Sequence, residues 1–173
     1  MSEPLTGGCL CGAIRYVVDA KVERLATCYC KDCQRMTSAG GSINALVPAS
    51  AFRLTKGQTR VFTKTADSGN ALHRHFCGDC GSWIYNPMGG DPEHVVLKAG
   101  TFDRHEGMKI VLNLWASSRT PWALMDPTLT THDKHLPKPA KYVRHRPATL
   151  RAGLSGLAGL TPSDGKIQAK PGI

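Results

Sequence analysis

The sequence predicts a mainly β protein that folds as one domain and carries a C-terminal extension. Seven separate runs are rich in β-branched and aromatic residues, which favour strands. Most of these runs are bounded by Gly, Pro, Asp or Asn, the residues that form tight turns. The first 137 residues contain no long stretch with a 3.6-residue apolar period. A length of 173 residues suits one domain with a substantial core.

The expected strands follow one another from residue 13 to residue 116. They are 13–18, 41–48, 59–64, 71–77, 82–86, 94–100 and 109–116. The segment "PASAF" at 48–52 predicts a short helical turn, with Phe52 packed inward. Strand alternation places His73 and His75 on the same side of the run at 71–77.

The net charge of +9 is concentrated near the C-terminus. Residues 138–173 contain seven Lys or Arg and one Asp, and therefore contribute +6. A solvated tail is the simplest interpretation of such a segment. Weak electrostatic contact with nucleic acid or an acidic surface is the alternative, although we do not expect nucleic acid to be a regular partner.

We expect no secretory leader, no membrane association and a cytoplasmic location. The first residues show no basic region followed by an apolar run, and no stretch approaches the roughly 18 apolar residues that span a bilayer. The cysteines agree with a reducing compartment, because an odd count in C-x-C and C-x-x-C spacings does not suit a disulfide framework.

All seven cysteines fall into three clusters, which are Cys9 and Cys11, then Cys28, Cys30 and Cys33, then Cys77 and Cys80. Closely spaced thiolates are the preferred ligands of structural zinc, whereas reduced core cysteines would be expected to scatter along the chain. Gly78 and Gly81 give the third cluster the backbone freedom that a metal-binding turn needs. The clusters therefore predict zinc.

Spacing alone leaves two ways to divide the cysteines between zinc ions. The two C-x-x-C pairs, Cys30/Cys33 and Cys77/Cys80, could share one ion as in a zinc ribbon. That choice leaves the other three cysteines scattered. The second division is four plus three, with the outer two clusters closing one site and the central cluster forming an open one. It keeps every cluster whole, and for that reason we favour it.

Five segments in this order resemble the glutathione-dependent formaldehyde-activating enzyme family, which includes centromere protein V. They are "GGCLCGAIRY", "CYCKDCQR", "RHFCGDCGSWIY", "LKAGTFD" and "WASSRTPW". The resemblance covers about residues 5–140 and implies an Mss4-like, zinc-bound fold of small antiparallel sheets. It therefore predicts a zinc-binding domain at 5–140 and a basic, Gly/Ala/Leu-rich extension at 141–173.

The resemblance also implies roles for the clusters. Cys9, Cys11, Cys77 and Cys80 match the ligands of a structural zinc, and Cys28, Cys30 and Cys33 match those of a second, open zinc at the catalytic site. A three-ligand site is expected to be only partly occupied. The implied reaction is that of a carbon–sulfur lyase on a thiol adduct such as S-hydroxymethylglutathione, which joins glutathione and formaldehyde. One departure is Tyr29, where the family often has histidine, and this difference could change the substrate or remove the activity.

Several neighbouring residues are candidate helpers, and each also has an ordinary structural explanation. Arg35 could bind a substrate carboxylate through two parallel hydrogen bonds. His75 could relay a proton. The remaining candidates are the pocket residues Trp115, Arg119 and Trp122 and the turn residues Thr37 and Ser38. The alternative function is a zinc-stabilised binding module without catalysis, associated with nucleic acid through its basic tail.

Overall fold

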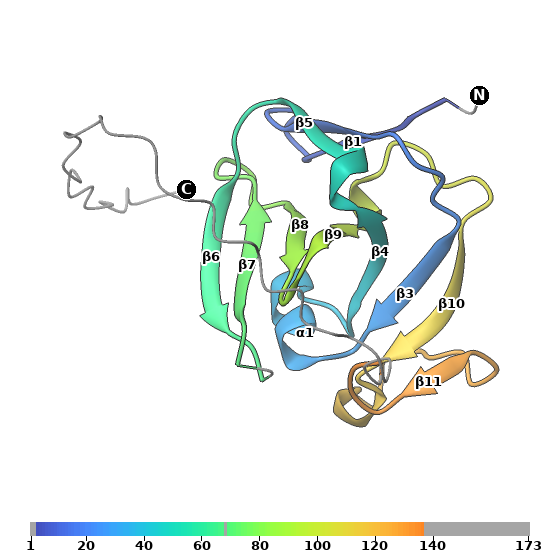
Figure 1. The fold of residues 1–173 in the computed structure, drawn as a ribbon. Coiled ribbons are helices and arrows are strands. Elements are labelled where there is room, and N and C mark those ends of the chain that lie inside the picture. Colours follow the sequence, from blue (N-terminus) through green and yellow to red (C-terminus); the bar gives the residue numbers. More distant parts are fainter. Residues whose placement is uncertain (1–2, 68, 137–173) are drawn as a thin grey trace, which may run out of the picture. The chain divides into compact units, whose positions relative to one another are not determined.

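The structure is a computed structural model that describes residues 3–67 and 69–136. Within these residues the chain forms two β-sheets and one short α-helix, which confirms the mainly β prediction (Figure 1). The smaller sheet is antiparallel and has the order β1-β2-β5. Its strands are β1 (Leu5–Gly8), β2 (Arg15–Val18) and β5 (Phe52–Lys56).

The larger sheet has eight strands in the order β11-β10-β3-β4-β9-β8-β7-β6. Their bounds are β3 (Arg24–Cys28), β4 (Ser42–Pro48), β6 (Arg60–Thr65), β7 (Ala71–Phe76), β8 (Trp83–Met88), β9 (Asp91–Lys98), β10 (Lys109–Leu114) and β11 (Thr130–His132). From β3 to β6 all neighbours are antiparallel. β10 is parallel to both β3 and β11.

All seven predicted strands are present, as β2, β4 and β6 to β10. The turn predicted at 48–52 is the 3-10 helix η1 (Ala49–Ala51). Phe52 packs inward as expected, with ring centroids 5.5 Å from Tyr16 and 4.7 Å from Tyr85. Two further 3-10 turns are η2 (Ala99–Thr101) and η3 (Ala116–Ser118). The sequence interpretation missed β1, β3, β5, β11 and the helix α1 (Lys31–Thr37).

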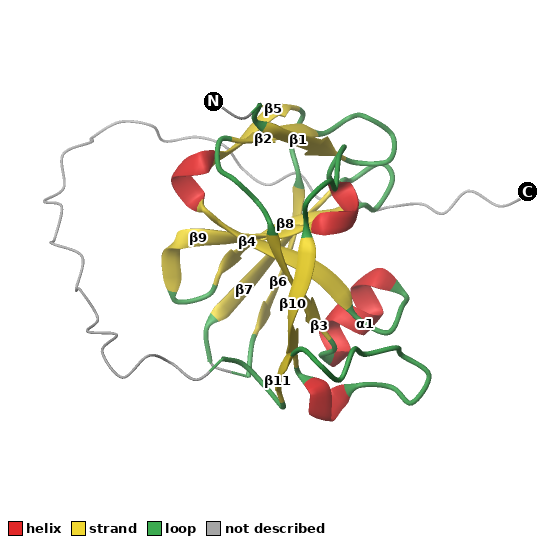
Figure 2. Cartoon of the chain, turned by 90° about the vertical axis from the view of Figure 1, so that its right-hand side faces the viewer, coloured by secondary structure: helices red, strands yellow, loops and turns green. Residues whose placement is uncertain are grey.

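The core lies where the small sheet crosses one end of the larger sheet (Figure 2). Both sheets contribute buried side chains, among them Leu5, Tyr16, Val18, Val47, Ile84 and Leu97. Cys9 and Cys77 belong to the same buried cluster. The outer two cysteine clusters are therefore part of the junction between the sheets.

Helix α1 lies between the β6–β7 side and the β3–β10 side of the larger sheet (Figure 1). It begins after Cys30, whose sulfur accepts a hydrogen bond from the backbone N–H of Cys33. It ends at Ser38, which adopts the left-handed conformation with φ of 53°. The hydroxyl of Thr37 donates to the carbonyl oxygens of Cys33 and Gly41. Local hydrogen bonds thus fix both ends of this seven-residue helix.

In the described part of the chain, no helix has the length and hydrophobicity needed to cross a membrane. The predicted extension at 141–173 lies outside the described residues. The domain boundary near residue 140 therefore stays a prediction.

Candidate metal centres

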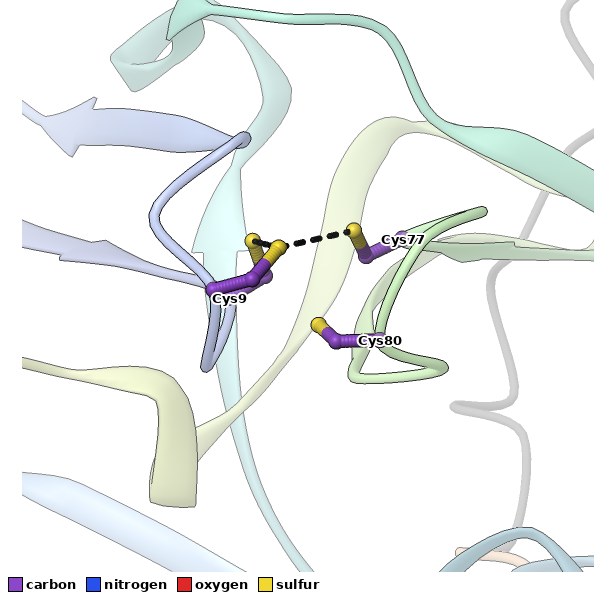
Figure 3. A group of neighbouring side chains, drawn as sticks. Cys9, Cys77 and Cys80 are labelled. Carbon is purple, nitrogen blue, oxygen red and sulfur yellow. Dashed lines mark hydrogen bonds between the residues drawn. The ribbon is translucent and has the colours of Figure 1, made fainter. Parts of the chain in front are cut away.

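Four cysteines from two distant loops lie together at the junction of the sheets. Cys9 and Cys11 lie between β1 and β2, and Cys77 and Cys80 lie between β7 and β8. Their four sulfur atoms are all within 4.8 Å of one another. In Figure 3 Cys77 and Cys80 point from their loop toward Cys9. We call these four residues the closed group.

The sulfur spacing in the closed group suits one tetrahedral metal ion. A zinc ion with Zn–S bonds of about 2.3 Å places its ligands roughly 3.7 Å apart. The Sγ atoms of Cys9 and Cys11 are 3.5 Å apart, and those of Cys11 and Cys77 are 3.7 Å apart. All seven cysteines are free thiols rather than disulfides. Ligand type and spacing therefore both fit zinc.

Neighbouring polar groups already favour negative charge on the closed group. The backbone N–H of Ile14 donates to the sulfur of Cys9 at 3.2 Å. The hydroxyl of Ser82 lies 3.2 Å from the sulfur of Cys80, and this hydrogen bond is the main cause that lowers the pKa of Cys80 to about 5. Ser82 in turn accepts from the backbone N–H of Leu10 at 3.1 Å, which links the two loops.

The central cluster forms a second group of three sulfurs, also within 4.8 Å of one another. Cys28 ends β3, Cys30 caps α1 and Cys33 lies in its first turn. Cys33 is buried, whereas Cys28 and Cys30 are partly exposed. No other His, Cys, Asp or Glu of residues 3–67 and 69–136 joins this group. We call these three residues the open group.

The geometry separates the two C-x-x-C pairs, because Cys30 and Cys33 lie in one group and Cys77 and Cys80 in the other. The zinc-ribbon division is therefore not the arrangement in this fold. Inside the open group, hydrogen bonds from Cys28 and then Cys30 lower the pKa of Cys33 to about 3. The same contacts, first with Cys30 and then with Cys33, raise the pKa of Cys28. The group therefore stabilises a thiolate at Cys33.

Beside the open group lies a buried lysine that the sequence interpretation did not single out. Lys98 ends β9, and its Nζ donates to Oδ1 of Asn44 at 2.6 Å and lies 3.4 Å from the ring centroid of Trp83. Burial lowers the pKa of Lys98 to about 8, against the opposing effect of the negative charge on Cys33. The sequence pattern that could have identified Lys98 is a lysine within an otherwise apolar strand segment.

An ion pair anchors α1 to the sheet. Asp32, between Cys30 and Cys33, accepts a 2.6 Å hydrogen bond from the guanidinium of Arg74 on β7, and Lys64 of β6 lies 3.0 Å from the same carboxylate. The Arg74 side chain is 4% exposed and that of Asp32 is 26% exposed. No other carboxylate of the described residues forms an ion pair with Arg74. Asp32 therefore neutralises a buried charge and holds the helix that carries the open group.

Asp32→Asn is expected to lower the free energy of unfolding by about 2 kcal/mol, because it leaves the buried guanidinium without a counter-charge. The chain offers a matched control, since Asp79 occupies the same position in the other C-x-x-C segment but is exposed. Asp79→Asn should change the stability by less than about 0.5 kcal/mol. Urea denaturation of both variants measures the difference, and equal effects would contradict this role of Asp32.

Two of the candidate helper residues, Arg35 and His75, differ in exposure and in contacts. Arg35 is exposed in the last turn of α1. His75 stacks on Tyr85 with centroids 4.1 Å apart, its Nδ1 lies 2.8 Å from Oγ1 of Thr59, and burial lowers its pKa. Alternation along β7 places His75 on the face opposite Arg74 and α1. These contacts indicate that His75 has a structural role and does not belong to the open group.

Residues after β10 form a loop that packs against α1. Gln34 donates through Nε2 to the carbonyl oxygens of Tyr29 and Ser118. The buried Tyr29 donates to the carbonyl oxygen of Leu124 at 2.9 Å. The residue that departs from the family motif therefore holds this loop in place.

The candidate pocket residues lie on the same loop. Trp115 adopts a left-handed φ of 58° and meets His135 edge-on, with ring centroids 5.0 Å apart. Arg119 donates to the carbonyl oxygen of Ala123 at 2.6 Å. Trp122 is 68% exposed. The contacts of Trp115 and Arg119 described above are with the loop and its neighbours rather than with a cysteine.

A hollow of about 450 Å³ lies against this loop and is lined by residues that include Thr27, Tyr29, Ile43 and Leu124. Thr27 and Ile43 alternate with Cys28 and Ser42, so this hollow is on the opposite face of the sheet from the open group. Another hollow, of about 230 Å³, is lined by residues that include Glu3 and Arg104. Neither of these two hollows is lined by a cysteine.

Comparison with known families gives a match over residues 4–118 to the model of the glutathione-dependent formaldehyde-activating enzyme. The chain belongs to this family. The matched range includes all seven cysteines and Lys98. It ends before the predicted boundary near residue 140.

Two similar proteins show how much of the chain the similarity covers. A Halomonas elongata protein, whose name places it provisionally in the same family, is 32% identical over 101 residues, or 55% of this chain and 64% of its own length. The match thus spans less than two thirds of that relative. A crystal structure of a Rhodobacter sphaeroides protein is 21% identical, with a TM-score of 0.47, over 57% of this chain and 87% of its own.

Proposed function

We propose that this chain is a zinc-dependent enzyme of the carbon–sulfur lyase type, acting on S-hydroxymethylglutathione or a related adduct of a thiol and a small carbonyl compound. The observation that carries the proposal is the open group in a chain of this family. It offers three sulfur ligands, two of them partly exposed, and no fourth His, Cys, Asp or Glu ligand among the described residues. A substrate sulfur would complete such a set.

The two groups would hold two zinc ions with different roles. Cys9, Cys11, Cys77 and Cys80 would hold a structural ion, because four thiolates close the coordination sphere. Cys28, Cys30 and Cys33 would hold the second ion, less tightly and with partial occupancy. When bound there, zinc would accept a substrate sulfur and lower the pKa of its thiol.

The reaction balances without an oxidant or a reductant. In the forward direction a bond forms between the thiol sulfur and the carbonyl carbon, the C=O π bond breaks, and the thiol proton moves to the oxygen. The reverse reaction breaks the C–S bond. Because thiols add to formaldehyde readily in water, the chain has to supply mainly orientation.

Arg35 is our candidate for holding a substrate carboxylate. It is exposed at the end of the helix that carries Cys33, and no other described side chain forms an ion pair with it. Guanidinium groups bind carboxylates through two parallel hydrogen bonds. Arg35 could therefore orient a glutathione-like substrate without losing an existing partner.

A cytoplasmic location and a domain boundary near residue 140 belong to the same proposal. Free thiols persist in a reducing compartment, and all seven cysteines are free. The closed and open groups both lie before residue 81, well inside the proposed domain at 5–140.

The proposal predicts that zinc-loaded protein accelerates exchange between glutathione with formaldehyde and S-hydroxymethylglutathione. We expect at least about a tenfold increase over the uncatalysed rate, equivalent to roughly 1.4 kcal/mol of barrier lowering. Exchange spectroscopy by NMR measures both directions at equilibrium. Boiled, zinc-supplemented protein is the control, and equal rates with native and boiled protein would contradict the proposal.

A second candidate function is a zinc-stabilised binding module without catalysis. The observation that favours it is that neither hollow described above is lined by Cys28, Cys30 or Cys33. In that case the protein would leave the exchange rate at its uncatalysed value, and glutathione would leave the metal environment of the open group unchanged.

A further inference from the structure

Lys98 occupies an unusual position for a lysine, because its charge is buried without a carboxylate. Its relative exposure is 7%. Its Nζ contacts are with the amide oxygen of Asn44 and the ring of Trp83, both uncharged. No ion pair of the described residues includes Lys98. A buried ammonium normally requires an opposite charge nearby, since its desolvation is costly.

The negative charges that act on Lys98 are those of the open group. Strand pairing places Lys98 opposite Asn44 on β4, and Ser42, two residues away on the same face of β4, lies opposite Cys28 of the open group. In this arrangement the charges of Cys33, Cys28 and Cys30 act on the ammonium, that of Cys33 most strongly. The other charge acting on it is the Arg74 guanidinium, which repels it. Asp32 already pairs with Arg74 and Lys64. The cysteines are therefore the available counter-charge for Lys98.

The charges balance when a divalent ion is present. Three thiolates and one divalent metal ion carry a net charge of −1, and Lys98 brings the sum to zero. A fixed positive charge is useful at the open group, because the sulfur ligand Cys33 is buried and solvent screens its charge poorly.

We propose that Lys98 is a positioning residue whose ammonium provides the counter-charge for the open group and so determines how tightly that group holds its metal. Asn44 fixes the ammonium, because its Oδ1 accepts from Lys98 while its Nδ2 donates to the carbonyl oxygen of Ser42 at 2.9 Å. The inference rests on the proposed metal site but not on the proposed reaction.

The test measures zinc retention rather than activity. Zinc-loaded protein is titrated with a chromogenic chelator, and the zinc released per chain is recorded. Lys98→Met keeps the length and packing of the side chain but removes its charge. We expect the open group of this variant to bind zinc about 10- to 100-fold more weakly, while the zinc of the closed group is retained and reports that the domain is folded.

Two further variants make the test specific. Asn44→Asp leaves Lys98 in place but adds a negative charge beside it, and should weaken the same zinc. Lys31→Met is the matched control, since Lys31 is exposed within the C-x-x-C segment of the open group and donates to Gln34. It removes the same charge from the chain and should change zinc affinity by less than about twofold, because exposed charges are strongly screened.

The possible outcomes separate this inference from the proposed function. Weaker zinc binding in Lys98→Met and Asn44→Asp, but not in Lys31→Met, supports the inference even if the protein does not accelerate the exchange reaction. The inference is overturned if Lys98→Met binds the second zinc as tightly as the wild type. If Lys98→Met does not fold, the same result in Asn44→Asp overturns it. It is also overturned if Lys31→Met weakens the zinc equally, or if the wild-type chain binds one zinc ion only.

Discussion

Cys77→Ser is expected to unfold the domain. Cys77 is 1% exposed, and its sulfur lies 3.7 Å from that of Cys11 on the other side of the junction between the two sheets. In zinc-dependent domains the metal contributes on the order of 10 kcal/mol to folding, while a whole domain is stable by only about 5–15 kcal/mol. Loss of one ligand from the closed group should therefore remove most of the stability.

Circular dichroism and thermal unfolding measure this effect. The control is Ser82→Ala, which removes a hydrogen-bonding neighbour of Cys80 but no sulfur ligand, and it should cost only about 1 kcal/mol. A Cys77→Ser protein with the melting temperature of the wild type would contradict a structural role for the closed group.

Cys30→Ser is expected to leave the domain folded, to remove the metal from the open group and to reduce the exchange rate to its uncatalysed value. The structure explains why the fold should survive. Cys30 is the N-cap of α1 and accepts a hydrogen bond from the N–H of Cys33 at 3.4 Å. Serine is among the best N-cap residues, so the change in stability should stay below about 1 kcal/mol.

Elemental analysis should find two zinc ions per chain in the wild type and one in Cys30→Ser. Thermal unfolding of the same samples tests the fold, and NMR exchange tests the rate. If Cys30→Ser destabilises the domain as strongly as Cys77→Ser, the two groups do not have separate structural and catalytic roles.

The sequence predicted strands best where the pattern lies within one short segment. Most of the seven predicted strands have enough β-branched and aromatic residues to be recognised alone. β1 reads LTGG and β11 reads TTH, and neither shows such a run. The pairing of β10 with β3 and β11 is parallel and joins distant segments, so local composition carries no sign of it.

Helix α1 was missed because the C-x-x-C segment was interpreted only as a metal-binding turn. The helix has seven residues, fewer than the 8–20 that make a typical helix recognisable from sequence. Its capping by a cysteine sulfur is outside the usual Ser, Thr, Asp or Asn pattern. The first turn of α1 was therefore hidden within the cluster itself.

The buried charges around the open group depend on strand register. Arg74 and Lys98 lie on β7 and β9, while Asp32 lies on α1, and the sequence separates them by tens of residues. Only the assembled sheet brings Arg74 to Asp32 and Lys98 to Asn44. The cysteines could be recognised from their spacing, whereas the residues that tune them could not.

The central claim is that the open group handles a substrate thiol while the closed group does not. Its most direct test is the visible absorption spectrum of the Co²⁺-loaded protein during titration with glutathione, compared between the wild type and Cys30→Ser. We predict a saturable change in the wild-type spectrum, from one of the two metal ions, and no change in Cys30→Ser. A wild-type spectrum that glutathione leaves unchanged, or an equal change in Cys30→Ser, would contradict the claim.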